Sequence, residues 1–416
     1  MKKVGFFVAV LMGLILWLTM AACGGKNVTG VSDQLPRELT VLEKKLVERD
    51  NRFSIDLFKQ TNALDAKKNV ILSPLSASFA LAMTLNGANH ATRDSMILAL
   101  RLGDMQESEI NQSYQSLMEL LLNLDPNVIM EIANAIFYKE NYGFEQAFLD
   151  INRKYFNAEV RGLNFFDPGA LGIINGWVKD KTRGKIEKII DNIDPNDVMF
   201  LINAIYFKGI WLYQFDKSKT QDDQFRLEDG STREVKMMMQ TAYLDYLAND
   251  EIEAVDLPYG GGAFRMTVIL PRAGQRMDAF IANLTAEKWQ AWMNSFGKDS
   301  VTVHLPRFKL RYDTRLNRPL SDIGMGIAFD PQRADFTRMY KNGGLFISYV
   351  RQKTYVEVNE EGTEAAAVTV VAVRSTAIGP SGPKLFRVDR PFLFVIREKN
   401  SGTILFIGKV LDPTAE

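Results

Sequence analysis

The chain has 416 residues, of which 46% are hydrophobic, and its 50 lysine and arginine residues balance 50 aspartate and glutamate residues. A formal net charge of zero excludes the basic surplus typical of nucleic-acid-binding proteins, and the sequence contains neither a Walker-type phosphate loop nor a dinucleotide-binding glycine motif. The length would allow two or three domains, but no linker interrupts residues 48–412, so we expect one unit with a large core.

The N-terminus has the order of a secretory signal. Two lysines precede an apolar run over residues 4–20, which small residues and Cys23 follow. An uncleaved membrane anchor is the alternative, because residues 4–22 are long enough to span a bilayer. Glycines within the run and the two alanines before Cys23 favour cleavage instead. We therefore assign residues 1–22 to a signal peptide.

The stretch from Ala21 to Gly24 resembles the lipobox of bacterial lipoproteins, in which the cysteine is acylated and becomes the mature N-terminus. Met20 stands where leucine is usual. The resemblance implies export and a membrane anchor through lipid on Cys23. We expect the outer membrane, with surface exposure as the preferred orientation. Residues 23–38 would form the lipidated N-terminus and a flexible tether. Since Cys23 is the only cysteine, an exported chain forms no internal disulfide and depends on packing for its stability.

Helical patterns dominate the first half of the chain. Apolar residues recur at near-helical spacing from Leu42 to Leu57, which predicts a long helix starting near residues 36–40. The segment from Ser73 to Ser76 opens the next helix. A serine before a helix is a common N-cap, but that role explains one serine and not two around a proline. Residues 144–190 are also predicted to be helical.

Strand signals dominate after residue 225. Residues 225–238 have the pattern of a hairpin that turns at Asp229-Gly230. Residues 265–271 and 301–312 are predicted to be further strands. Helices before residue 200 and strands after it, without regular alternation of strand and helix, indicate the α+β class.

The most unusual stretch covers residues 355–378. Val356 and Val358 alternate with polar residues, as in a half-buried strand. Residues 363–378 then contain no Pro, Asn, Asp or Gly, the usual turn residues. One alternate face would carry no charge: Thr363, Ala365, Ala367, Thr369, Val371 and Val373. That face could be buried in the centre of a sheet, whereas an edge strand or a solvated alanine-rich helix is the simpler alternative.

Two segments near the C-terminus carry a family resemblance. EEGTEAAA at residues 360–367 and DRPFLFVIREKNSGTILFIGKV at residues 389–410 resemble the reactive-loop hinge and the C-terminal signature of the serpins. Further segments follow the order found in that family: residues 69–88, 175–186, 201–211, 255–259, 303–308 and 334–336. The resemblance implies a serpin domain over residues 39–416, with helices packed on three β-sheets, a large central sheet and an exposed reactive-centre loop at about residues 362–383.

The resemblance also implies roles for individual residues. The hinge of the loop would comprise Glu360, Glu361, Gly362, Thr363, Ala365, Ala366 and Ala367. At the breach, Glu360 would pair with Arg307 beside Trp211; if exposed, such an ion pair is worth about 0–1 kcal/mol. The shutter would contain Ser73, Pro74, Ser76, Asn203 and Gln352. The family usually has histidine at the position of Gln352, and glutamine can also donate and accept hydrogen bonds there.

The function implied by the resemblance is suicide inhibition of serine proteases, and of some cysteine proteases. After cleavage, the N-terminal part of the loop enters the central sheet and traps the covalent acyl-enzyme, a switching transition known for this family. The family's spacing places the cleaved bond at Thr376–Ala377, about 46 Å of strand from Thr363, for elastase- or subtilisin-like enzymes. Arg374–Ser375 is the alternative for trypsin-like enzymes.

Catalytic chemistry has no support in the sequence. No motif pairs His90 or His304 with a nucleophile, and no cluster of metal ligands is present. We therefore expect neither an enzyme nor a cofactor. The alternative function is a non-inhibitory serpin acting as a binding or chaperone module, which a proline between residues 363 and 371 would favour; none occurs. We also expect a monomer that forms loop-to-sheet polymers on mild heating, since an unpaired strand can enter a neighbour's sheet.

Overall fold

The computed structural model describes residues 37–363 and 382–415. Several predicted features lie outside these residues: the signal peptide, Cys23, Ala365, Ala366, Ala367 and the bonds Arg374–Ser375 and Thr376–Ala377. Across the described residues, no helix combines the length and the apolar character needed to cross a membrane.

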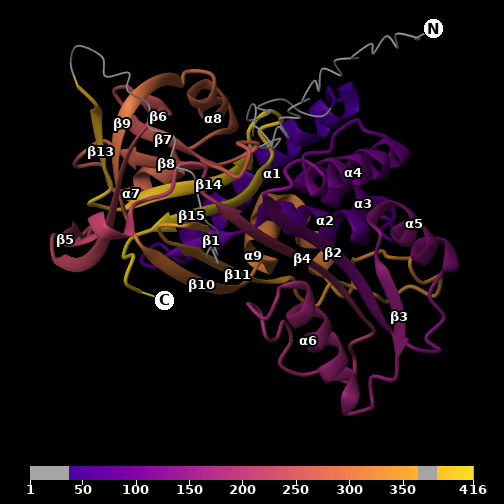
Figure 1. Cartoon of the computed structure of the whole chain (residues 1–416). Coiled ribbons are helices and arrows are strands. Elements are labelled where there is room, and N and C mark those ends of the chain that lie inside the picture. The colour runs from indigo at the N-terminus through magenta and orange to yellow at the C-terminus, as the bar shows by residue number, and fades with distance from the viewer. Residues whose placement is uncertain (1–36, 364–381, 416) are drawn as a thin grey trace, which may run out of the picture. The chain divides into compact units, whose positions relative to one another are not determined.

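The helices cluster in the first half of the chain, as predicted (Figure 1). α1 begins next to the predicted residues, because Thr40 and Glu43 form a capping box in which each side chain accepts a hydrogen bond from the other's backbone N–H. The α-helices are α1 (Val41–Leu64), α2 (Pro74–Leu85), α3 (His90–Ala99), α4 (Glu107–Leu122), α5 (Gln146–Phe156), α6 (Gly169–Lys181), α7 (Met277–Ala282), α8 (Ala286–Met293) and α9 (Asn317–Leu320).

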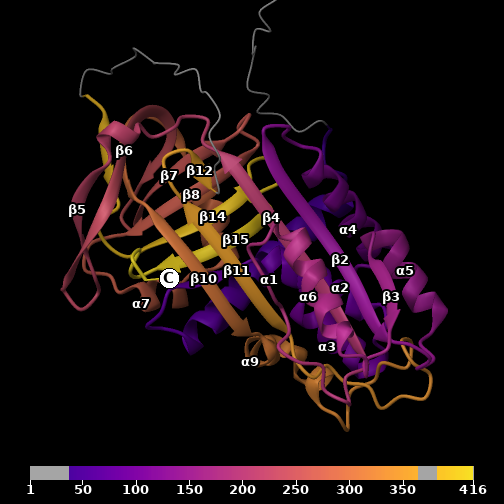
Figure 2. The same cartoon turned by 60° about the horizontal axis from the view of Figure 1, so that its bottom comes forward.

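A six-stranded sheet runs through the molecule in the order β10-β11-β12-β4-β2-β3. Its strands are β10 (Phe308–Arg315), β11 (Arg351–Val358), β12 (Gly362–Thr363), β4 (Met199–Ile210), β2 (Val128–Lys139) and β3 (Glu159–Leu163). All neighbouring strands are antiparallel except β2 and β3, which are parallel. Figure 2 shows β10, β11, β4 and β2 crossing the view in this order.

A second sheet has the order β1-β15-β14-β8-β7-β6-β9-β13, with β5 also paired to β6. Its strands are β1 (Val70–Leu72), β15 (Ile404–Val410), β14 (Phe392–Glu398), β8 (Phe264–Pro271), β7 (Ile252–Tyr259), β6 (Thr232–Ala248), β9 (Gly297–Pro306), β13 (Lys384–Arg387) and β5 (Gln221–Arg226). Three sheets are expected from the sequence; the 17-residue β6 pairs with both β7 and β9, so hydrogen bonds join two of them into one.

Some local predictions need correction. Residues 144–190 are only partly helical, because β3 lies between α5 and α6 and the chain after α6 forms turns and irregular backbone up to residue 198. No strand is predicted before residue 200, yet β2 has 12 residues. Its partners lie far away in the chain, on β4 and β3, and such pairing leaves little local signal. The predicted strand at residues 301–312 is divided between β9 and β10 at Arg307.

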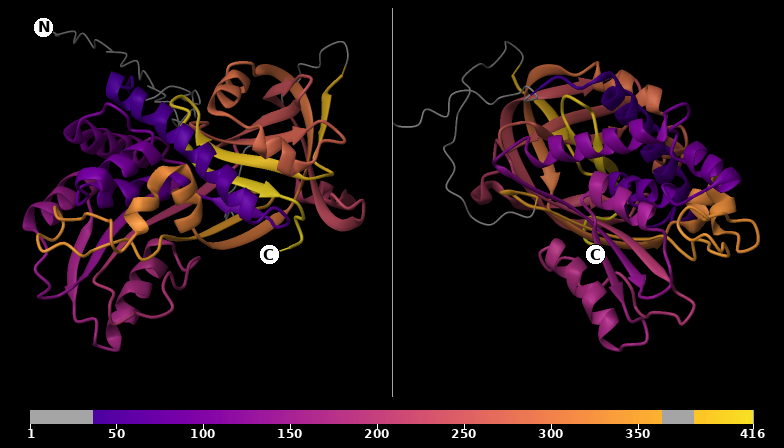
Figure 3. Two further views of the ribbon diagram at one scale, coloured as in Figure 1. Left: turned by 180° about the vertical axis from the view of Figure 1, so that it is seen from behind. Right: turned by 90° about the vertical axis from the view of Figure 1, so that its right-hand side faces the viewer.

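β4 separates two hydrophobic cores. Phe207 belongs to the larger core, which includes α2, whereas Phe200 and Ile202 pack with Trp177 of α6. Side chains of a strand alternate between its two faces, so the odd positions of β4 face α2 and the even positions face α6. In the right-hand view of Figure 3, α6 lies in magenta on the other side of these strands from the indigo and purple helices.

Candidate functional site

The candidate site lies where two strands of the six-stranded sheet separate. β12 joins β11 to β4 at one end only, since Thr363 pairs with Val358 of β11 and with Gly209 of β4. Past Thr363, no described strand lies between β4 and β11. A cavity of about 640 Å³ follows this separation, lined by both strands, by α2 and by residues 182–198. We call this cavity the opening.

The irregular segment 182–198 covers the α6 side of the opening. Asn175 of α6 holds it in place, because its Oδ1 accepts hydrogen bonds from the N–H groups of Ile189 (2.8 Å) and Ile190 (3.1 Å). Arg351 of β11 donates to Asp191 of the segment at 2.6 Å. The segment therefore connects α6 to β11 across the opening.

Two glycines let the hinge enter the sheet. Gly362 has a φ of +154°, and a Cβ at this position would lie 2.1 Å from the carbonyl oxygen of Gly209. A Cβ on Gly209 would lie 2.7 Å from a ring carbon of Tyr259. Both distances are far shorter than normal atomic contacts, so a side chain at either position would push the strands apart. The Trp211 N–H also donates to the Glu361 carbonyl at 2.8 Å.

Glu360 is a buried anion at the base of the hinge. Its carboxylate is 2% exposed and accepts hydrogen bonds from Arg307 Nε at 2.7 Å and from Thr220 Oγ1 at 2.5 Å. Burial acts to raise the pKa of Glu360, but the hydrogen bonds from Arg307 and Thr220 outweigh it, and the pKa is lowered overall. The structure thus brings Glu360 and Arg307 into contact, with the carboxylate buried rather than exposed. Its neighbour Glu361 pairs with Lys217.

Trp211 packs under the same hinge. Its indole stacks on the ring of Tyr259 with centroids 4.3 Å apart and an interplanar angle of 14°, and its Nε1 donates to the Asn359 carbonyl at 2.9 Å. The hydroxyl oxygens of Tyr259 and Thr363 lie 2.6 Å apart. Tyr259 is not among the residues assigned from the sequence, although the segment at residues 255–259 belongs to the family pattern. An aromatic residue ending that segment is the signal that could have found it.

On the α2 side of the opening, Gln352 of β11 binds the backbone of Ser73. The Ser73 N–H donates to Gln352 Oε1 at 2.9 Å, and Gln352 Nε2 donates to the Ser73 carbonyl at 2.8 Å. The Ser73 hydroxyl donates to the Leu405 carbonyl at 2.8 Å and makes no capping hydrogen bond to α2. Pro74 occupies the first position of α2, where a missing N–H costs nothing.

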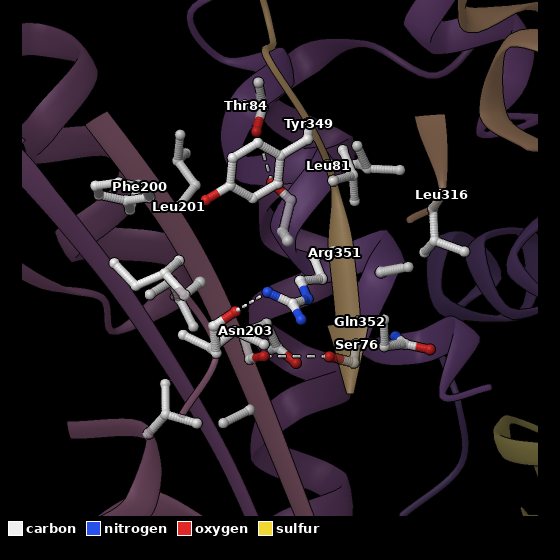
Figure 4. Close-up of a pocket in the computed structure, with 18 of the residues that line it drawn as sticks. Ser76, Leu81, Thr84, Phe200, Leu201, Asn203, Leu316, Tyr349, Arg351 and Gln352 are labelled. Carbon is white, nitrogen blue, oxygen red and sulfur yellow. Dashed lines mark hydrogen bonds between the residues drawn. The ribbon is translucent and has the colours of Figure 1, made fainter. Parts of the chain in front are cut away.

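Ser76 and Asn203 meet across the opening, as Figure 4 shows. The Ser76 hydroxyl donates to the backbone carbonyl of Asn203 at 3.3 Å, while Asn203 Nδ2 donates to Asn134 Oδ1 of β2 at 2.7 Å. Asn134 is not among the residues predicted from the sequence, because it lies in β2, which is not predicted as a strand. Asn203 Oδ1 and Thr354 Oγ1 are buried without a hydrogen-bond partner among the described residues. Each of the two strands that border the opening therefore carries a buried polar atom without a hydrogen-bond partner among the described residues.

Comparison with known families decides what this arrangement belongs to. Residues 48–413 match the family described as Serpin (serine protease inhibitor). The chain belongs to the serpin family. This confirms the serpin fold that the resemblance implied, and it means that the opening, the hinge and the buried Glu360 lie in a serpin domain.

This serpin is similar to its relatives over most of its length. It is 36% identical over 376 residues to Serpin B8 of Homo sapiens, which covers 88% of this chain and 99% of that relative. It is 35% identical over 382 residues to Leukocyte elastase inhibitor of Sus scrofa, covering 89% of this chain and 100% of that relative.

Solved serpin structures are similar to it in fold. The native state of Tengpin, a thermophilic serpin, superposes with a TM-score of 0.81 at 35% identity and covers 90% of this chain and 95% of that one. Human thyroxine-binding globulin gives a TM-score of 0.81 at 28% identity, with 90% and 100% covered. The fold is therefore shared with a thermophilic serpin and with a globulin named for binding thyroxine.

Neither histidine of this serpin lines the opening. His90 follows α2 and begins α3, and its Nδ1 lies 2.8 Å from an oxygen of Asp335. His304 is half-buried on β9, and its pKa is lowered, first by burial and then by Arg387. Within residues 37–363 and 382–415, no group of three His, Cys, Asp or Glu side chains could hold a metal ion.

Proposed function

We propose that this serpin inhibits serine proteases as a suicide substrate, and that the cleaved loop enters the opening between β4 and β11 as a new strand. The observation that carries the proposal is the geometry of β12. Thr363 already pairs with both β11 and β4, Gly362 pairs with β4, and the opening continues from Thr363 between the same two strands. Cleavage would free one end of the loop, which could then add to the sheet as a strand at this position.

The register of β12 supports this function. Counting six residues onward from Thr363 leads to Thr369, and counting six residues back from its partners leads to Asn203 on β4 and Gln352 on β11. Directly paired residues share a face of the sheet, so the Thr369 hydroxyl would arrive beside Asn203. Its hydroxyl would there supply a partner for the buried Asn203 Oδ1, which has none among the described residues.

The composition of the loop suits entry into a closed sheet. The face that continues from the buried Thr363 carries Ala365, Ala367, Thr369, Val371 and Val373. None of these side chains is charged. On this face, insertion therefore buries no isolated charge, which would cost several kcal/mol.

The target class follows from the bond that is cut. The relative named Leukocyte elastase inhibitor supports an elastase-like target, which fits cleavage at Thr376–Ala377 by an elastase- or subtilisin-like enzyme. Cleavage at Arg374–Ser375 by a trypsin-like enzyme remains the second option, and it shortens the inserted strand by about 7 Å. Cysteine proteases are further targets to be tested.

The proposed location is an exported one. Lipid on Cys23 would anchor the serpin to a bacterial membrane, with the outer membrane and surface exposure preferred. We assign it no catalytic activity, no cofactor and no nucleic-acid partner, and we expect a monomer.

The experiment mixes the purified full-length chain with an elastase, with subtilisin and with trypsin. Denaturing gels would show whether a serpin–protease band survives, and intact masses of the released peptide would locate the cleaved bond. We expect a denaturant-stable band at the summed mass and a peptide starting at Ala377 with elastase.

The alternative, a non-inhibitory serpin acting as a binding or chaperone module, makes a different prediction. It would give complete cleavage in the loop with no stable band for any protease of a wide panel. That outcome would reject suicide inhibition.

A further inference from the structure

We propose that the Tyr259 hydroxyl is a positioning group that holds Thr363 in the sheet before any protease is bound, so that loop insertion starts from an existing strand pair. This inference rests on the proposed suicide inhibition and adds a residue to it. Tyr259 ends β7, a strand of the second sheet, so the group that holds the hinge comes from outside the six-stranded sheet.

Among the described residues, the Tyr259 hydroxyl has one side-chain hydrogen-bond partner. The residue is 0% exposed, and its ring is fixed between Trp211, stacked at 4.3 Å, and Phe207, in edge contact at 5.1 Å. The Thr363 hydroxyl, 2.6 Å away, is the hydrogen-bond partner that the described residues offer it. With the ring unable to turn toward solvent, a Thr363 outside the sheet would leave a buried hydroxyl unpaired.

Thr363 is also buried, at the end of the short strand β12. It is 2% exposed and is the last described residue of a strand only two residues long. Strands of this length have few backbone hydrogen bonds to hold them. A side-chain hydrogen bond between buried groups is stronger than the same bond at the surface, so the bond to the Tyr259 hydroxyl adds to the few backbone hydrogen bonds that hold Thr363 in the sheet.

The consequence concerns two competing steps, insertion of the loop and hydrolysis of the acyl-enzyme. After cleavage, the acyl-enzyme is either trapped by insertion or hydrolysed, and the ratio of these two rates sets how many serpin molecules are consumed for each protease trapped. Forming the first pair of a new strand requires closing a flexible chain onto the sheet, which costs entropy. Because Gly362 and Thr363 are already paired, insertion only has to propagate.

The test compares Tyr259→Phe, Thr363→Val and the double variant in the full-length chain. The matched control is Tyr312→Phe on β10, which removes a hydroxyl that donates a hydrogen bond to Asp65 at 2.8 Å. We expect each hinge variant to slow insertion by about 2- to 10-fold, the effect of one net hydrogen bond, and to raise the number of serpins consumed per trapped elastase. The double variant should do no worse than either single one, Thr363→Ser should behave as wild type, and Tyr312→Phe should leave the number unchanged.

The inference would be overturned if wild type traps the protease and Tyr259→Phe consumes the same number of serpin molecules per trapped protease as wild type. Additive effects in the double variant would also overturn it. Either result would leave the proposed function standing. Absence of any wild-type complex would instead remove the proposed function. In that case amide hydrogen exchange still tests the contact in the uncleaved protein. The Gly362 and Thr363 amides should exchange faster in Tyr259→Phe than in wild type, and equal protection would refute the role of the hydroxyl.

Discussion

Gln352 and Ser73 form a closed pair in which the side-chain amide both donates to and accepts from one residue's backbone, at 2.8 and 2.9 Å. This pair ties β11, one strand of the opening, to the start of α2. Glutamine therefore satisfies two buried backbone groups at a position where the family usually has histidine.

Replacing Gln352 with methionine should destabilise the native fold by about 1–3 kcal/mol, because the N–H and carbonyl of Ser73 would stay buried without partners. The measurement is urea unfolding of both proteins. The control, Gln221→Met, changes an exposed glutamine on β5 and should have little effect. Equal unfolding midpoints for wild type and Gln352→Met would contradict the importance of the pair.

Asp50 should make the stability of the protein depend on pH. It lies in α1 and is 1% exposed, its carboxylate oxygens have no hydrogen-bond partner among the described residues, and it faces Ser78 of α2 and Tyr114 of α4. Burial raises its pKa to about 7. The folded chain then keeps a proton that the unfolded chain has lost, so stability falls as pH rises from about 4 to about 7.

The stability of Asp50→Asn relative to wild type should therefore be higher at pH 8 than at pH 5, by an amount on the order of 3 kcal/mol. Thermal unfolding of both proteins at the two pH values measures it. Asp56→Asn on the same helix is the control; Asp56 pairs with Arg101, so this variant should gain nothing at pH 8. Parallel pH profiles for wild type and Asp50→Asn would show that the proton is not retained.

Arg307→Ala should loosen the hinge. Glu360 would keep Thr220 as a partner but lose its charged one, at a cost of about 1–3 kcal/mol, reduced because Arg307 is 42% exposed. We expect loop-to-sheet polymers at a lower temperature than in wild type, followed by native gels after heating. Arg311→Ala, on the exposed face of β10, is the control.

The pH dependence of this effect has a defined sign. Since the pKa of Glu360 is lowered in the fold, its pairing stabilises the protein fully above the ordinary value of 4.5 and is lost as pH falls below it. The difference between wild type and Arg307→Ala should shrink under those acidic conditions. A wild-type preparation that stays monomeric until it unfolds would count against polymerisation altogether.

Gly362→Ala tests the close approach of the hinge to β4. The added Cβ would meet the Gly209 carbonyl at 2.1 Å, so β12 should leave the sheet and more of the serpin should be cleaved without trapping the protease. Gly176→Ala on α6 is the matched control, because its Cβ would meet nothing within 4 Å. Equal amounts of complex from both variants on a denaturing gel would argue against the inserted hinge.

Thr369→Glu tests the inward face of the loop. A carboxylate entering beside Asn203 would be buried without a counter-charge, at a cost of several kcal/mol. We expect an elastase to cleave this variant at the normal rate with little complex formed. Ser381→Glu adds the same charge beyond the proposed cleavage sites and should trap the protease as wild type does. Normal trapping by Thr369→Glu would exclude insertion to this depth.

The parts of this fold that the sequence predicts are those with a local signal. The start of α1 is visible because apolar residues recur at near-helical spacing from Leu42 onward, and the capping box of Thr40 and Glu43 then fixes it in the structure. The alternation in β11 is visible because Val356 and Val358 are buried while Glu357 is not. The hinge residues were predicted from the family resemblance alone. The pairing of Glu360 with Arg307, which the resemblance also implied, appears in the structure.

The missed features depend on neighbours that are distant in the chain. β2 owes its strand conformation to β4, and Asn134 becomes part of the site only because β4 places Asn203 opposite it. The partner of Tyr259 could not be read from composition, because a tyrosine ending a strand is equally compatible with an unrelated core contact. Only the three-dimensional arrangement shows that its hydroxyl reaches Thr363, 104 residues away.

The opening between β4 and β11 has one further consequence. If the cleaved loop fills it, as proposed, that molecule has used its reactive loop and traps no second protease. On the proposed function, protection would therefore scale with the number of molecules on the membrane and not with time. A cell relying on this serpin would have to match its supply of new copies to the amount of protease it meets.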